Sequence, residues 1–121
     1  MIHRTKSLLL VSALSALCLS GCASKSTYYW GEYEQLVHDM YVEPGSADPT
    51  TQIEQLTADI QKAQSKGKPT PPGVNAHLGY MYSLQGNTSQ AKNAFLQERA
   101  LYPESAVFID GMLKRAYGDK K

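Results

Sequence analysis

Cysteine is scarce in this chain of 121 residues, which contains only Cys18 and Cys22. Both lie near the amino terminus, so residues 23–121 have no thiol that could form a disulfide. Small secreted domains often depend on disulfides for their stability. No such framework can hold this fold together.

A strong excess of one charge is also lacking, because the chain contains 12 basic and 11 acidic residues. Proteins that bind nucleic acids usually concentrate lysine and arginine on one stripe, where these side chains displace the counterions of the phosphates. The sequence contains no such concentration. We therefore expect no nucleic-acid partner.

Motifs of catalysis are missing as well. The sequence contains no His-Glu-x-x-His pair, no glycine-rich phosphate loop and no serine in a Gly-x-Ser-x-Gly setting. His38 lies beside Asp39 and could form one corner of a metal site, but a surface histidine next to an acid is the commoner arrangement. We expect a protein that is not an enzyme and that has no catalytic residues, metal, cofactor or small-molecule substrate.

Long hydrophobic runs are limited to Leu8–Leu19, which is shorter than the ~20 residues that a membrane-spanning helix needs. The run follows Arg4 and Lys6 and ends in small residues, as in a secretory signal peptide. These features predict a signal peptide over residues 1–21.

The end of this run, Leu19-Ser20-Gly21-Cys22, resembles the lipobox of bacterial lipoproteins, in which the cysteine is acylated and the chain is cut just before it. The resemblance implies that Cys22 carries a covalent lipid such as palmitate and that residues 22–27 form a lipidated tether. Two or three acyl chains hold a protein firmly on a membrane. Lipoproteins that stay in the inner membrane typically have an aspartate after the modified cysteine, whereas this chain has Ala23. The resemblance therefore implies that the protein is anchored to the periplasmic face of the outer membrane. The alternative is an ordinary secretory signal with an unmodified Cys22.

After the tether, the sequence predicts one all-α domain of about five helices over residues 28–118. Apolar and aromatic residues recur every three or four positions in residues 28–41, which predicts the first helix. Thr51 and Glu54 have the spacing of a capping box and predict the start of a second helix over residues 50–66.

The segment Val74–Pro103 reproduces most of the tetratricopeptide-repeat pattern, with Leu78-Gly79-x-x-Tyr82, Ala91-x-x-x-Phe95 and the closing proline. The resemblance implies a pair of packed helices, in which Gly79 permits close approach. Asn75 and Glu98 depart from the pattern, and we expect them to loosen packing against a neighbouring repeat. One repeat cannot bury its apolar face alone. A last helix over residues 103–118 is therefore expected to cap these helical hairpins.

Four blocks of the chain together resemble a family of short proteobacterial lipoproteins of unknown function. The blocks are "YYWGEYE", "GKPTPPG", "LGYMYSLQGNTSQAKNAF" and "LYPESAVFIDGML". The resemblance implies an envelope lipoprotein with a helical-repeat body and admits association with envelope lipoproteins of the curli-secretion-channel type. It implies no reaction.

The function that these features favour is that of a small adaptor for another envelope protein. In repeats of this type the first helix of each pair usually lines the inner surface, which suggests His77, Tyr80 and Leu84 as partner-binding residues. The alternative is a lipoprotein that associates with peptidoglycan or activates an enzyme. An envelope enzyme is a third class.

The aromatic residues that follow the tether have two interpretations. Tyr28, Tyr29, Trp30 and Tyr33 could cap the end of the helical bundle, or they could lie at the lipid surface, because tyrosine and tryptophan favour membrane interfaces. The sequence leaves both open.

Overall fold

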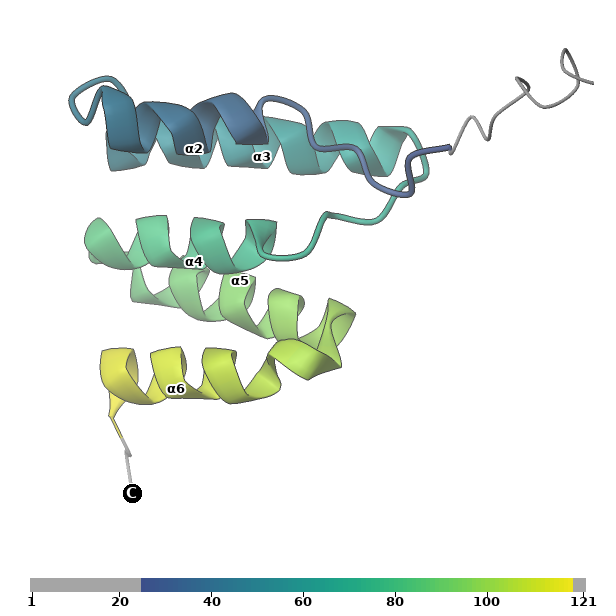
Figure 1. Cartoon of the computed structure of the whole chain (residues 1–121). Helices are drawn as coiled ribbons and strands as arrows, with labels where there is room; N and C mark the ends of the chain where they lie inside the picture. Colours follow the sequence, from purple (N-terminus) through teal and green to yellow (C-terminus); the bar gives the residue numbers. More distant parts are fainter. Residues whose placement is uncertain (1–24, 119–121) are drawn as a thin grey trace, which may run out of the picture.

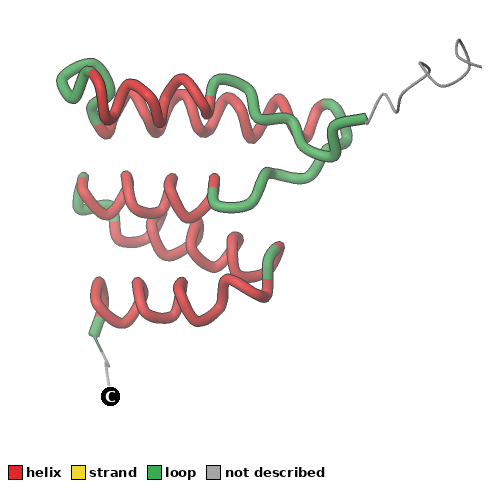
Figure 2. Tube along the Cα trace, viewed as in Figure 1, coloured by secondary structure: helices red, strands yellow, loops and turns green. Residues whose placement is uncertain are grey.

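The computed structural model describes residues 25–118, so the expected signal peptide and Cys22 lie outside the described residues. Within this part every regular element is helical, which confirms the all-α fold class with five α-helices (Figure 2). The elements are α2 (Tyr33–Val42), α3 (Pro49–Ser65), α4 (Val74–Leu84), α5 (Thr88–Leu101), the short 3₁₀ helix η1 (Pro103–Ser105) and α6 (Ala106–Tyr117).

The helices stack as successive layers (Figure 1). The α2–α3 pair forms the first layer, the α4–α5 pair forms the second, and α6 follows as the third. Helix α2 packs on α3 and α6 packs on α5, while α4 contacts both α3 and α5. This arrangement places α2, α4 and α6, the first helix of each layer, along one side of the stack.

Helix α2 begins at Tyr33, so the predicted start at residue 28 is wrong. Gly31 has a φ of +53°, in the left-handed region, and cannot continue a right-handed helix there. The backbone N–H of Glu32 donates to the Asp59 carboxylate of α3 at 3.0 Å, and a side chain at Gly31 would overlap that carboxylate. The residues before α2 therefore run along α3 instead of forming a helical turn.

Helix α3 is capped by Asp48 and not by the expected capping box of Thr51 and Glu54. Asp48 Oδ1 accepts hydrogen bonds from the backbone N–H groups of Thr50 at 2.9 Å and Thr51 at 3.3 Å. Pro49 occupies the first turn, where its missing N–H costs nothing. The Thr51 hydroxyl donates to the same carboxylate at 2.6 Å, which places Thr51 inside the helix.

The α4–α5 hairpin has the close approach expected from its glycine. A Cβ atom at Gly79 would lie 2.8 Å from the Phe95 ring, which is too close for any side chain. Ala91 is fully buried, and Phe95 is 1% exposed. Asn87 Oδ1 accepts from the backbone N–H of Gln90 at 3.3 Å and caps α5, because asparagine satisfies one of the free donors of the first turn.

Two clusters of buried side chains form the core, one on each side of α4. Tyr82 of α4 packs against both. The first cluster joins the α2–α3 pair to the α4–α5 pair, and the second joins the α4–α5 pair to α6. The first contains Leu36, Ala47, Leu56, Val74, Leu78, Met81 and Ala94, and the second contains Ala76, Ala91, Phe95 and Ile109.

The two departures from the repeat pattern lie inside the protein. Asn75 is 1% exposed and Glu98 is 3% exposed. Glu98 Oε1 accepts a hydrogen bond from the backbone N–H of Gly73, so this side chain fastens the loop before α4 to α5. Glu98 therefore has a structural role in this loop, and the expected loosening of the packing against a neighbouring repeat stays a prediction.

Candidate functional site

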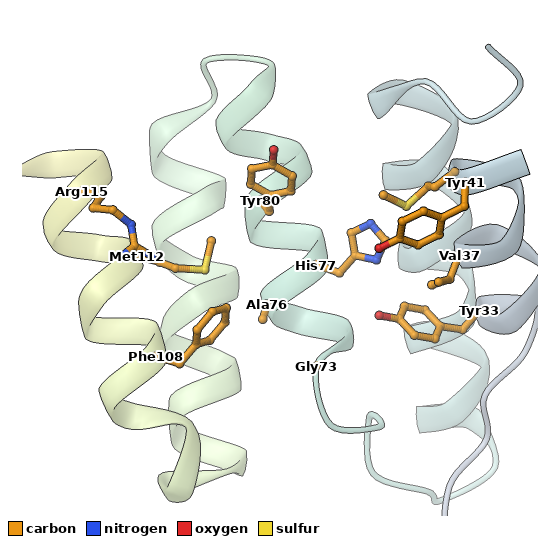
Figure 3. Close-up of a pocket in the computed structure, with 11 residues that line it drawn as sticks. Tyr33, Val37, Tyr41, Gly73, Ala76, His77, Tyr80, Phe108, Met112 and Arg115 are labelled. Carbon is orange, nitrogen blue, oxygen red and sulfur yellow. The ribbon is translucent and has the colours of Figure 1, made fainter. Parts of the chain in front are cut away.

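An open groove of about 480 Å³ runs between α2 and α6, with α4 at its base (Figure 3). Helices from all three layers supply its side chains, so the groove forms only when the whole stack is assembled. The lining residues are Tyr33, Val37, Met40 and Tyr41 from α2, Gly73, Ala76, His77 and Tyr80 from α4 and the residue before it, and Phe108, Met112 and Arg115 from α6.

The lining is mostly apolar and aromatic, and much of it faces solvent. Tyr41 is 81% exposed, Phe108 is 58% exposed and Tyr80 is 45% exposed. Soluble domains rarely gather large apolar side chains on one exposed surface unless that surface binds something. The groove is therefore the strongest candidate for a binding site in the described part of the chain.

Arg115 is the one lysine, arginine or carboxylate side chain among the lining residues of the groove. Its guanidinium forms no ion pair within residues 25–118, where the arginine that does so is Arg99, 2.8 Å from Asp110. Among the described residues, the groove thus presents a positive charge and no carboxylate. This asymmetry favours a negatively charged group on whatever binds there.

His77 lies half-buried in the wall of the groove and is held in one tautomer. The Gln52 amide nitrogen donates to the Ala47 carbonyl, so Gln52 Oε1 must accept the hydrogen bond from His77 Nε2, at 2.8 Å. The His77 ring also meets the Tyr33 ring edge-on, with centroids 5.7 Å apart. Burial lowers the pKa of His77, which favours the neutral imidazole.

The structure brings together two of the three residues suggested as a partner surface. His77 and Tyr80 line the groove, on successive turns of α4. Leu84, one turn further on, is 54% exposed but does not line it. The site is therefore centred on the first half of α4 and not on its carboxyl end.

The contributions of α2 and α6 to the groove were not predicted from the sequence. Both helices show apolar side chains at helical spacing, and such a stripe is normally assigned to the core. A second signal was present in α6, where Phe108, Met112 and Arg115 follow one another at steps of four and three. Such steps place residues on one face of a helix.

Other kinds of site have little support in the described residues. His38 Nδ1 lies 3.3 Å from Asp39 Oδ1, but residues 25–118 contain no group of three or more histidine, cysteine or acidic side chains that could hold a metal. Among the same residues, no helix combines the length and the apolar character that crossing a bilayer requires.

Comparison with known proteins identifies a family. A family model described as a domain of unknown function (DUF4810) matches residues 27–112, which include α2, α4 and the first half of α6. Neither the curated proteins nor the solved structures give a match. Because the model covers most of the chain, this protein belongs to the DUF4810 family.

Proposed function

We propose that this protein is a lipid-anchored adaptor on the periplasmic face of the outer membrane and that its groove binds a segment of another envelope protein. The observation that carries the proposal is the exposed apolar groove between α2, α4 and α6. Three helices supply it, as expected if the first helix of each tetratricopeptide-like hairpin lines an inner surface. A lipoprotein of the curli-secretion-channel type is one candidate partner.

The groove favours one kind of occupant, an apolar peptide segment that carries a carboxylate. Exposed aromatic side chains such as Tyr80 and Phe108 offer contacts to the apolar face of a bound segment. Arg115 offers a planar guanidinium, which pairs well with a carboxylate through two parallel hydrogen bonds. The neutral imidazole of His77 adds a hydrogen-bond acceptor, because Nδ1 is not protonated when Nε2 donates to Gln52.

The proposed anchor depends on Cys22, which precedes the first described residue by three positions. If Cys22 is acylated, the Cys22→Ser protein should lose its membrane retention in fractionated cells. Retention equal to that of the parent protein would contradict the anchor but would leave the groove untouched. The anchor and the groove can therefore be tested separately.

Photo-cross-linking in intact cells tests the groove. Benzoylphenylalanine at position 108 would point into the groove, and the same residue at position 107 supplies the matched control, because Val107 is 88% exposed on α6 and does not line the groove. We expect position 108 to cross-link to one envelope protein, through an apolar peptide that contains an acidic residue. Equal adducts at both positions, or none at position 108, would overturn the proposal.

A further inference from the structure

The segment that leads toward Cys22 is fastened to the body of the domain. Lys68 Nζ donates to the backbone carbonyl of Ser26 at 2.9 Å, and Lys66 Nζ lies 4.3 Å from the centre of the Tyr29 ring. Residues 25–32 therefore run along the last part of α3, and the chain leaves the domain beside the carboxyl end of that helix (Figure 1).

Positive charge is concentrated at this end. Residues 25–32 and 59–73 contain four lysines and two acidic residues, Glu32 and Asp59, and the Asp59 carboxylate accepts a hydrogen bond from the backbone N–H of Glu32. We call this end of the domain the basic end; its lysines are Lys25, Lys62, Lys66 and Lys68. The neighbouring element is η1, because Tyr102, the residue just before it, donates its hydroxyl to the Thr70 carbonyl. This element contributes an exposed carboxylate, that of Glu104.

Aromatic side chains lie in the same segment. The Tyr28 and Trp30 rings meet edge-on with centroids 6.1 Å apart, and Trp30 is 38% exposed. Tyrosine and tryptophan favour the headgroup level of a bilayer, where one part of the ring is dry and the other is wet. Basic and interfacial aromatic residues are therefore combined where the chain turns toward its expected anchor.

We propose that the basic end binds anionic lipid headgroups, so that the domain rests on the membrane in a fixed orientation and does not swing freely on its tether. Lys25 follows Cys22 by three positions, which limits the separation of their backbones to ~10 Å. The attraction of an anionic surface extends over about 8 Å at physiological salt. A lipid on Cys22 would thus hold the basic end within the field of the headgroups.

The inference rests on the proposed anchor, which would bring the basic end close to the membrane. The positive charge of the basic end belongs to the domain itself and does not depend on the anchor. Each lysine near an anionic surface strengthens contact by about fivefold. Two lysines should therefore change the contact equilibrium by about 25-fold. This effect is large enough to be measured residue by residue.

The test uses the purified full-length mature protein bound to phosphatidylcholine vesicles, with or without phosphatidylglycerol. A water-soluble, membrane-impermeant acylating reagent modifies exposed lysines, and mass spectrometry gives the rate at each position. We expect Lys62 and Lys66 to react several-fold more slowly when phosphatidylglycerol is present and to recover in high salt. Lys92, on α5 and outside the basic end, is expected to react at the same rate on both vesicles.

Charge removal supplies the second arm. Lys25 and Lys62 are both exposed, so Lys25→Gln with Lys62→Gln removes charge from the surface and leaves the core unchanged. In this variant the protection of Lys66 on anionic vesicles should weaken, because two of the four lysines are lost, whereas Lys92→Gln should leave it intact. Equal rates on both vesicles in the parent protein would overturn the proposal. Failure to remain on neutral vesicles would instead contradict the lipid anchor.

Discussion

The Glu98 carboxylate accepts a hydrogen bond from the backbone N–H of Gly73 at 2.7 Å, across 25 positions of sequence. This contact holds Gly73 in place. Gly73 is the N-cap residue of α4 and also lines the groove. The Gly73 N–H is partly buried, and a backbone donor that is shielded from water and loses its acceptor costs up to about 1–3 kcal/mol. The pair therefore links the stability of the fold to the shape of the site.

Replacement of Glu98 tests this link. We expect Glu98→Ala to lower the free energy of unfolding by about 1–3 kcal/mol, because it leaves the Gly73 N–H unpaired. Glu98→Gln keeps a carbonyl oxygen at the same place and should lose less. Urea denaturation of both variants measures the difference, and equal losses would show that the hydrogen bond contributes nothing.

The two glycines inside helices should respond in opposite directions. Gly79→Ala is expected to destabilise the protein by about 1–3 kcal/mol, because the new methyl group meets the Phe95 ring at 2.8 Å. At Gly111 of α6 the nearest atom to a new methyl is the Arg115 guanidinium nitrogen, at an ordinary 3.5 Å. Gly111→Ala should therefore stabilise the helix by up to about 1 kcal/mol. Thermal unfolding of the two variants measures both changes, and a shift of both midpoints in the same direction would contradict the prediction.

Acid should weaken the fold through His77. Burial lowers the pKa of His77 in the folded protein, so the unfolded chain binds the proton first as the pH falls. The contribution to stability is complete above the unfolded pKa of about 6.5 and is lost as the pH falls toward the lowered folded pKa. The pH dependence should shrink in His77→Gln and persist in the His38→Gln control, whose histidine is exposed. Urea titrations at several pH values check this, and identical pH slopes in the two variants would argue against it.

Arg115 should set the preference for an acidic partner. In the cross-linking assay, Arg115→Glu is expected to reduce the adduct at position 108 by about fivefold, the effect of losing an exposed ion pair. Lys92→Glu changes the net charge equally but lies outside the groove, so its adduct should match the parent. An unchanged adduct in Arg115→Glu would remove the carboxylate from the proposed partner.

Some of these features could be predicted from the sequence because they depend on residues close together in the chain. Others could not, because they depend on contacts between distant residues. The Gly79–Phe95 contact could be predicted because the repeat pattern encodes it within one hairpin. The start of α2 could not, because it depends on Asp59 accepting from Glu32, a contact between residues 27 positions apart. The capping box of Thr51 was a reasonable alternative to Asp48, and only the side-chain geometry distinguishes the two.

The candidate site was also predictable only in part, because some of its residues lie on one helix and others lie on helices far apart in the chain. His77 and Tyr80 lie on one helix, so their spacing alone placed them together. Tyr41 and Phe108 are far apart in the chain and line the same groove, on either side of α4, only after the stack has formed. Periodicity shows that a helix has an apolar face, but not whether another helix covers that face.

The two walls of the groove belong to the most loosely attached helices. Within the described residues, α2 packs chiefly on α3, and α6 packs chiefly on α5 and η1, whereas α4 and α5 share the most extensive contact in the stack. A bound segment would touch both outer helices at once and brace them against the centre. If the proposed adaptor function is correct, the occupied protein should resist proteolysis at its two ends better than the empty one, so that its amount in the cell would follow the supply of the proposed partner.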